Sequence, residues 1–184
     1  MDIQPTPLDG CLIIKPAIFG DERGYFFESF NQQKFNELTG QRTVFVQDNQ
    51  SYSTKGVLRG LHLQKGTSAQ AKLVRAVKGE VLDVAVDLRS NSKTYGKHFS
   101  IRLSGSNNLQ LFVPRGFAHG FVVLSDDAIF QYKCDNYYDK AVEGGIHYAD
   151  ATLDIDWLLP DEQLMVSDKD AVLPTLNNIS DLKF

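Results

Sequence analysis

The sequence is poor in the features that tie a chain to an oxidising or a membrane environment. Its 184 residues include only two cysteines, Cys11 and Cys134, which are too few for the disulfide framework of a secreted domain. We expect both to be small buried side chains in a reducing compartment. The chain begins without a basic region followed by a long apolar stretch, and none of its apolar runs approaches membrane-spanning length. These features predict a soluble, cytoplasmic protein without a membrane partner.

An excess of positive charge is missing as well. The 19 Lys and Arg residues stand against 23 Asp and Glu, for a net charge of -4, which argues against nucleic acid as the partner. The charge is nevertheless uneven, because residues 51–79 carry six basic side chains and residues 88–125 five, with no acidic one in either stretch. A positive middle favours a small polyanionic ligand held in a cleft. A solvated basic face, balanced in space by the acidic C-terminal part, would explain the same pattern equally well.

Several motifs with a known mechanical basis are absent. The sequence has no G-x-G-x-x-G dinucleotide loop, no P-loop, no G-x-S-x-G elbow, no H-E-x-x-H and no paired C-x-x-C. Each absence argues against the function that the motif would support, from a nucleotide-dependent oxidoreductase to a zinc protease.

What the sequence has in abundance is a period-two pattern. In residues 81–87 it places Leu82, Val84 and Val86 on one face of a strand, with Asp83 and Asp87 on the other. Further short strands, separated by turn signals, are predicted at 73–77, 98–103, 109–113, 119–124 and 128–133. Only Gln32 to Leu38, with Gly40 as its C-cap, indicates a helix, and a weaker one is expected after Trp157. The sequence therefore predicts an all-β sandwich or small barrel formed by one domain, residues 1–184.

Two segments concentrate the chemistry, and their spacing resembles the two signature segments of the cupin superfamily, a jelly-roll barrel with its site in the mouth. They read GVLRGLHLQ from position 56 and PRGFAHG from position 114. Metal-binding cupins supply H-x-H and a nearby Glu from the first segment and a last His from the second. Here Gln64 replaces the second His, and no Glu follows until Glu80. Because two of the four ligands are missing, we expect a pocket without metal.

His62 then needs another interpretation. A lone histidine is more often structural, but His62 lies in sequence between Arg59 and Lys72, and a second histidine, His119, occupies the other signature segment. An imidazole that titrates near neutral pH is a natural general base in such a positive pocket.

Seven distinctive blocks follow one another over nearly the whole chain. They are FGDERGYFFE from position 19, QDNQS from 47, GVLRGLH from 56, VPRGFAHG from 113, Tyr132, EGGI from 143 and SDKD from 167. In sequence and in order these blocks resemble the dTDP-4-dehydrorhamnose 3,5-epimerase family. The resemblance implies a double-stranded β-helix of the cupin type with a few short peripheral helices. It also implies a homodimer that exchanges N-terminal strands, and activity without metal or organic cofactor. The implied substrate is dTDP-4-dehydro-6-deoxy-D-glucose, converted to dTDP-4-dehydro-L-rhamnose for dTDP-L-rhamnose and polysaccharide biosynthesis.

The resemblance assigns catalytic roles to four residues. Carbons 3 and 5 of the sugar flank the C4 ketone, so epimerisation needs a base, a proton donor on the opposite face and positive charge at the C4 oxygen. The resemblance implies that His62 is the base, oriented by Asp170, although Asp168 lies two residues away and remains an alternative. It implies that Lys72 stabilises the enolate and also binds substrate, and that Tyr132 is the acid.

Binding roles follow from the same resemblance. Arg23 and Arg59 match positions that hold the pyrophosphate, since a guanidinium suits two phosphate oxygens. The remaining matches are Glu28, Gln47 and Asn49 around the nucleoside, His119 near the sugar, Glu143 and Lys169 at further positions, and Phe19 and Tyr138 against the thymine. Structural alternatives are an Arg23–Glu28 ion pair, core or interface roles for the two aromatics, and strand-edge capping by Gln47 and Asn49.

Three other functions stay open from the sequence alone. A relative that inverts only carbon 3 would carry similar residues. A metal cupin oxygenase would contain a bound transition metal. A non-catalytic nucleotide-sugar binding module would bind the ligand without exchanging its protons.

Overall fold

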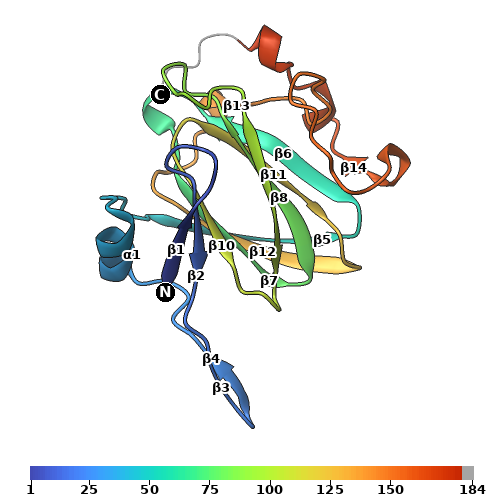
Figure 1. Ribbon diagram of the computed structural model, residues 1–184. Helices are drawn as coiled ribbons and strands as arrows, with labels where there is room; N and C mark the ends of the chain where they lie inside the picture. The colour runs from blue at the N-terminus through green and yellow to red at the C-terminus, as the bar shows by residue number, and fades with distance from the viewer. Residues whose placement is uncertain (180–184) are drawn as a thin grey trace.

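Two six-stranded β-sheets face each other and form the body of the molecule (Figure 1). The structure is a computed structural model that describes residues 1–179; the last five residues of the predicted domain 1–184 lie outside the described residues. The first sheet has the order β1-β2-β10-β7-β12-β5. Its strands are β1 (Asp2–Pro5), β2 (Leu12–Lys15), β5 (Gln47–Thr54), β7 (Lys72–Lys78), β10 (Gln110–Val113) and β12 (Asp127–Cys134).

The second sheet has the order β13-β6-β11-β8-β9, with the short β14 paired in parallel to β6. Its strands are β6 (Val57–Gln64), β8 (Glu80–Asp87), β9 (His98–Ser104), β11 (Phe117–Val123), β13 (Glu143–Gly145) and β14 (Met165–Val166). Every other pairing in the two sheets is antiparallel. The all-β jelly-roll prediction is confirmed, and each strand predicted by period two lies within one of β7 to β12 or overlaps it closely.

The two faces predicted for residues 81–87 are confirmed, and the structure adds that both are buried. Leu82, Val84 and Val86 do pack together, but they face the C-terminal segment, which covers the outer side of the second sheet with Leu153, Trp157 and Leu176. Asp83 and Asp87 are not solvent-exposed, because each is 0% accessible inside the sandwich. Both faces of β8 are therefore buried, since a long C-terminal segment, which includes the two-residue strand β14, supplies the outer layer.

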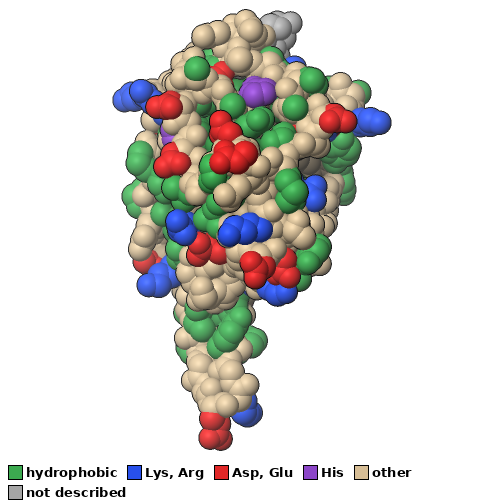
Figure 2. All heavy atoms as spheres, turned by 90° about the vertical axis from the view of Figure 1, so that its right-hand side faces the viewer, with side chains coloured by type: hydrophobic (Ala, Val, Ile, Leu, Met, Phe, Trp, Pro, Cys, Tyr) green, Lys and Arg blue, Asp and Glu red, His purple; other side chains and the backbone are tan. Residues whose placement is uncertain are grey.

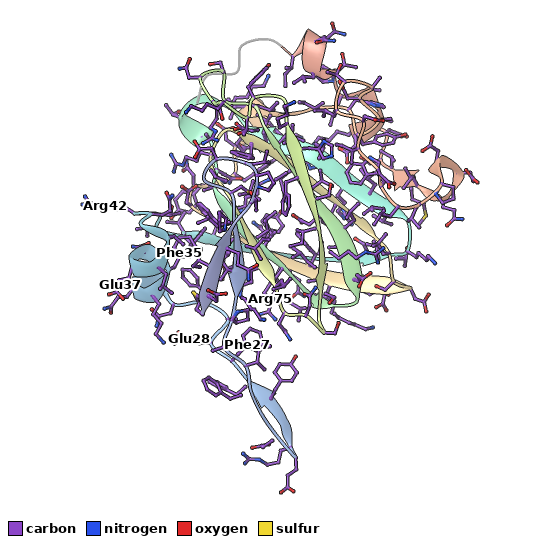
Figure 3. The ribbon with its side chains drawn as sticks, viewed as in Figure 1. Phe27, Glu28, Phe35, Glu37, Arg42 and Arg75 are labelled. Atoms are coloured by element: carbon purple, nitrogen blue, oxygen red, sulfur yellow. The ribbon has the colours of Figure 1, made fainter. Side chains whose placement is uncertain are left out.

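One α-helix packs on the outer face of the first sheet. α1 (Gln32–Thr39) begins at Asn31, whose side chain accepts a hydrogen bond from the Lys34 amide, and ends at Gly40 with a left-handed φ of 68°. Its buried Phe35 packs on the sheet (Figure 3), with its ring centroid 5.3 Å from that of Phe112. The helix predicted after Trp157 is wrong: the chain forms only a 3₁₀ turn there, Asp161–Gln163, and becomes extended at Leu164 before β14. Four more short 3₁₀ turns, at Gly66–Ser68, Lys140–Val142, Asp170–Val172 and Leu176–Asn178, complete the peripheral helices.

A hairpin of β3 (Phe19–Asp21) and β4 (Gly24–Phe26) projects from the body (Figure 1). All six of its strand residues are exposed, including Phe19 at 66% and Phe26 at 71%. Figure 2 shows hydrophobic side chains where this arm leaves the body and an acidic and a basic side chain at its tip. At its base, the guanidinium of Arg75 lies 5.0 Å from the ring centroid of Phe27 (Figure 3).

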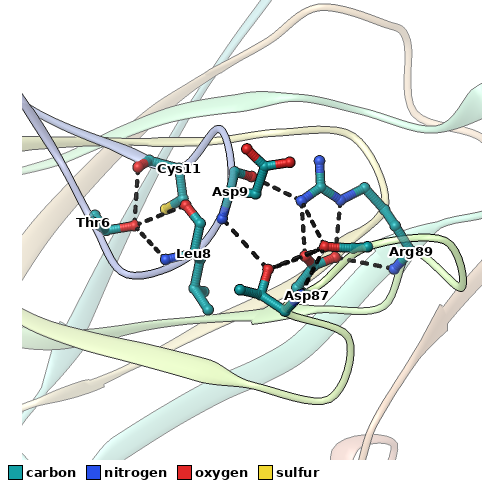
Figure 4. A network of polar contacts seen from close by, with 8 residues as sticks. Thr6, Leu8, Asp9, Cys11, Asp87 and Arg89 are labelled. Atoms are coloured by element: carbon teal, nitrogen blue, oxygen red, sulfur yellow. Dashed lines mark hydrogen bonds and ion pairs between the residues drawn. The ribbon is translucent and has the colours of Figure 1, made fainter.

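A polar network ties the loop before β2 to the end of β8 (Figure 4). Arg89 donates to both carboxylate oxygens of Asp87 and to the Asp9 carbonyl, while Thr6 bonds the Cys11 carbonyl. Cys11 and Cys134 are free and buried, as expected of the two side chains, and burial raises the pKa of Cys11 to about 12. Within residues 1–179, no helix combines the length and the apolar character needed to cross a membrane.

Candidate active site

A cavity of about 480 Å³ opens between the two sheets. A smaller space of about 230 Å³ adjoins it, and Asn49, His62, Lys72 and Tyr132 line both. The cavity receives side chains from β5, β6, β7, β11 and β12 and from residues 165–170. Of the predicted site residues, those that line one space or the other are Gln47, Asn49, Arg59, His62, Lys72, His119, Tyr132, Tyr138, Glu143, Lys169 and Asp170.

His62 and Asp170 form one side of the cavity. Nε2 of His62 lies 2.6 Å from Oδ1 of Asp170, and Oδ2 of Asp170 accepts a hydrogen bond of 3.2 Å from the Gly60 amide. Burial disfavours the charged Asp170 carboxyl, yet the contacts with His62, Gly60 and Ser167 hold its pKa below the ordinary value. Asp168 is exposed, so it is Asp170 that the fold places against the ring.

Glycine at position 60 has a steric reason. A Cβ there would lie 2.6 Å from the Cα of Gly120, so β6 and β11 approach each other at this point only without side chains. The register between the two strands shifts here, between His119 and Phe121. This irregularity lies two residues before His62, where it presents the Gly60 amide to Asp170.

Tyr132 and Lys72 face His62 from the other sheet. Tyr132 pairs with Val74 and Cys134 with Lys72 in the β12–β7 register, so the tyrosine and the lysine lie on the same face of neighbouring strands. Nζ of Lys72 is 6.0 Å from the centroid of the Tyr132 ring. Burial raises the pKa of the Tyr132 phenol and lowers the pKa of the Lys72 ammonium, which nearby anionic groups, Asp83 among them, partly offset.

His119 has a carboxylate partner that the sequence did not reveal. Its Nε2 lies 3.0 Å and 2.9 Å from the two oxygens of Asp83, and this pair is buried below the cavity. Asp83 is the functional candidate that sequence reasoning missed, because the alternation of β8 gives its face but not the residue that it contacts across the strands. A usable signal was present: an acidic residue stands between two apolar ones in an otherwise apolar strand.

The remaining cavity residues surround its opening. Nε of Arg59 donates to the Ser53 hydroxyl at 3.1 Å. Lys169 forms a 2.6 Å ion pair with Glu143, which also accepts a 2.9 Å hydrogen bond from the Tyr138 hydroxyl. Burial opposes ionisation of Glu143, but these two partners hold its pKa below the ordinary value.

Gln47 and Asn49 alternate along β5 and are joined by a 3.1 Å hydrogen bond. The Gln47 side chain also accepts from the Tyr138 amide, and Asn49 contacts the sulfur of Cys134. Local hydrogen bonding therefore accompanies any ligand role that these two residues have.

Three predicted binding residues lie elsewhere. Phe19 and Arg23 are on the projecting arm, and Glu28 follows it; none of the three lines the cavity. Arg23 pairs with Asp21, and Glu28 with Lys34 at 2.9 Å, so an Arg23–Glu28 ion pair is not formed within the chain, and such a pair across a dimer interface stays a prediction.

Gln64, which replaces the second histidine ligand of metal-binding cupins, has a structural role. Gln64 is buried, and its side-chain oxygen accepts a 3.0 Å hydrogen bond from the Asp139 amide. In the part of the chain that the structure describes, no group of three or more His, Cys, Asp or Glu side chains is placed to hold a metal ion.

Comparison with known proteins places this geometry in a family. The family model described as dTDP-4-dehydrorhamnose 3,5-epimerase matches residues 5–178. The chain belongs to this family. A dTDP-4-dehydrorhamnose 3,5-epimerase from Shigella flexneri is 54% identical over 170 residues, which are 92% of this chain and 93% of that protein. The family resemblance predicted from the seven sequence blocks is therefore confirmed.

Solved structures agree with that assignment. A dTDP-6-deoxy-D-glucose-3,5-epimerase from Legionella pneumophila, solved with dTDP-4-keto-L-rhamnose, is 51% identical with a TM-score of 0.93; the match covers 97% of this chain and 94% of that one. A 3'-monoepimerase from Streptomyces bikiniensis, solved with dTDP-quinovose, is 32% identical with a TM-score of 0.87, covering 94% and 87%. Both belong to the same fold, and the double epimerase is the more similar of the two.

Proposed function

We propose that this protein inverts carbons 3 and 5 of dTDP-4-dehydro-6-deoxy-D-glucose to give dTDP-4-dehydro-L-rhamnose. One observation carries the proposal: His62 on one sheet, in contact with Asp170, faces Tyr132 and Lys72 on the other sheet across a single cavity. Inversion at a carbon next to a ketone needs a base and an acid on opposite sides of that carbon. Family membership supports the choice of substrate.

The proton transfers use His62 and Tyr132. With Nε2 held by Asp170, Nδ1 of His62 is the ring nitrogen left to remove the proton from carbon 3 or 5. The electron pair of the broken C–H bond forms a C=C bond and the C4 ketone becomes an enolate oxygen. When the ketone re-forms, Tyr132 delivers a proton to the other face of the same carbon and later regains one from solvent.

Lys72 stabilises the enolate in this scheme. Its ammonium lies beside Tyr132, and among the residues that the structure describes it has no ion-pair partner. A single preorganised donor at a developing oxyanion contributes about 3–4 kcal/mol. The scheme uses no metal or organic cofactor, because side chains stabilise the negative charge at the C4 oxygen.

The nucleotide occupies the opening of the cavity. Arg59 binds the pyrophosphate, where a guanidinium can hold two oxygens at once. Tyr138 stacks on the thymine, while Gln47, Asn49, Glu143 and Lys169 contact the nucleoside and His119 contacts the sugar. The positive charge of residues 51–79 then attracts a dianionic ligand. Of the six basic side chains in this stretch, only Arg59 and Lys72 line the cavity.

We infer that the active protein is a cytoplasmic homodimer in which the arm of one chain completes the site of the other. The exposed Phe19 and the paired Arg23 lie outside their own cavity, although their positions match binding positions of the family. Mixed dimers test this: chains with Arg23→Ala and chains with His62→Ala, each inactive alone, regain about a quarter of the wild-type activity when co-expressed in equal amounts. Half of the dimers are then mixed, and one of the two sites in each mixed dimer is complete. No recovery in a verified mixed dimer contradicts exchange of the arm.

The deciding experiment is proton NMR of the substrate incubated with the protein in deuterated water. Deuterium at carbons 3 and 5 with inversion at both is expected. Exchange confined to carbon 3 assigns the protein to the monoepimerases, and no exchange leaves a binding module. Elemental analysis of the active protein checks the metal-free scheme, since a stoichiometric transition metal would favour an oxygenase.

A further inference from the structure

We propose that Asp83 is a positioning residue that holds His119 as a charged imidazolium, so that the ring donates a hydrogen bond to the C4 oxygen of the substrate. The identity of that oxygen rests on the proposed function. The charge of His119 rests on the geometry of β8 and β11 and can be measured without any substrate.

The two residues are fixed by strand register. His119 pairs with Ala85, and Asp83 with Phe121, in the antiparallel β11–β8 ladder, so the imidazole and the carboxylate are diagonal neighbours on one face. Both oxygens of Asp83 lie within 3.0 Å of Nε2 of His119. A carboxylate can only accept here, so Nε2 carries a hydrogen and donates it.

The buried negative charge of Asp83 has no other close partner among the described residues. Asp83 is 0% exposed, and within residues 1–179 its side chain has no hydrogen-bond partner besides His119. Asp87, equally buried on the same strand, has Arg89, Ser92 and Thr94. A buried carboxylate without a cation is strongly unfavourable, and the ring in direct contact is the group best placed to supply the charge.

The surrounding charges leave that role to His119. The charge of Asp83 raises the pKa of Lys72 against the larger effect of burial, but the two side chains are not within ion-pair distance. Asp170 is engaged by His62, and Glu143 by Lys169. The titratable and charged groups that face the pair from neighbouring elements are Cys11, Arg59, His62, Lys72, Tyr132, Lys169 and Asp170.

The second ring nitrogen is then a donor at the cavity. With Nε2 bound to Asp83, Nδ1 is the nitrogen left for a ligand, and it has no partner among the described residues. The ring stacks on Phe130 with centroids 6.2 Å apart and planes 20° apart, which restricts its rotation. An N–H held beside Lys72 in the same cavity suits an oxygen that becomes negative during the reaction.

The charge is tested by ¹⁵N NMR of histidine-labelled protein at neutral pH, with the His119 signal assigned by its loss in His119→Ala. Both ring nitrogens of His119 should be protonated in the wild type, and only one in Asp83→Asn. A neutral ring in the wild type overturns the proposal, and this result needs no variant at position 83 to fold. A charged ring in both proteins removes Asp83 as the cause and also overturns it.

Kinetics test the role in catalysis. Asp83→Asn should lower kcat about 10- to 100-fold while the Kd for dTDP stays within about twofold, because only the transition-state donor is weakened. In a His119→Ala background the same substitution should lower kcat by no more than about twofold, since Asp83 acts through His119. An unchanged kcat in Asp83→Asn, or full additivity with His119→Ala, overturns the proposal.

Asp87→Asn is the matched control. It removes a carboxylate of equal burial from the same strand, but its partners lie in the network of Arg89 rather than in the cavity. Its kcat per folded molecule should equal that of the wild type, and an equal loss would mean that Asp83 acts through packing alone. A wild type that exchanges no substrate protons refutes the proposed function, whereas the NMR result for His119 is unaffected by that failure.

Discussion

Asp170 is anchored to the strand whose histidine it contacts. Its Oδ1 lies 2.6 Å from Nε2 of His62, and its Oδ2 accepts from the amide of Gly60, two residues earlier on β6. The carboxylate is thus held at both oxygens by one strand, although 108 positions separate it from His62 in sequence. This arrangement fixes the orientation of the ring as well as its nearest charge.

Asp170→Asn should lower kcat by about 10²-fold or more, while the Kd for dTDP stays within about threefold. The amide keeps the shape of the side chain, but it no longer stabilises the positive ring that forms when His62 takes a proton. Steady-state kinetics and equilibrium binding of dTDP measure the two effects separately. The exposed Asp168→Asn serves as control and should match the wild type; equal losses in both variants would contradict the assignment.

Tyr132→Phe should separate the two halves of each inversion. The phenylalanine keeps the ring beside Lys72 but cannot donate a proton, so removal of the proton by His62 continues while delivery on the opposite face fails. Deuterium should still enter the substrate from solvent, whereas inversion at carbon 5 should fall at least 10-fold. NMR of the product mixture reports both, and an unchanged yield of the inverted product would show that another group is the acid.

The strands of the core were predictable because they obey a period of two and end in turn residues. Residues 98–103 and 128–133 lie within β9 and β12 for this reason. The burial of both faces of β8 was not predictable, because the segment that covers its outer side comes from more than 60 residues further along the chain. Period alone cannot distinguish a strand buried on one side from one buried on both.

The site was predictable in its residue types but not in its partnerships. The family blocks supplied His62 and Tyr132, the resemblance to the family also implied Lys72, and the fold places all three in one cavity. The Asp83–His119 pair depends on the register between β8 and β11, which local sequence does not specify. The location of Phe19 and Arg23 could not be predicted from their sequence block either, because a single chain does not bring these arm residues to its own cavity.

Arg59→Ala should weaken dTDP binding more than it lowers kcat. Nε of Arg59 is engaged by Ser53, which orients the terminal amino groups for a phosphate. Loss of charge-assisted hydrogen bonds should raise the Kd for dTDP roughly 10- to 100-fold. Arg59→Lys should recover only part of the affinity, because an ammonium cannot bind two oxygens in a fork.

Isothermal titration with dTDP gives the affinity directly. The control is Lys55→Ala, which removes an exposed cation of the same basic stretch that does not line the cavity. If Lys55→Ala weakened binding as much as Arg59→Ala, the general positive field of residues 51–79 would hold the ligand, and the specific role of Arg59 would be wrong.

Asp87 should make the stability of the fold depend on pH in the acid range. Burial opposes its charge, but hydrogen bonds from Arg89, Ser92 and Thr94 lower its pKa from 3.8 to about 2. A carboxyl whose folded pKa is depressed stabilises the protein above its unfolded pKa, and this contribution disappears as the pH falls through about 2. The free energy of unfolding should therefore contain about 2 kcal/mol from Asp87 at pH 6, at about 1.4 kcal/mol for each unit of pKa difference.

Urea denaturation of the wild type and Asp87→Asn between pH 6 and pH 2 measures this contribution. The difference in unfolding free energy between the two proteins should shrink by about 2 kcal/mol across that interval, with most of the change between pH 4 and pH 2. A difference that stays constant with pH would mean that the Arg89 network stabilises the protonated and the charged carboxyl equally. In that case the network would contribute packing and hydrogen bonds to the junction of β8 with the N-terminal loop, but no electrostatic stabilisation.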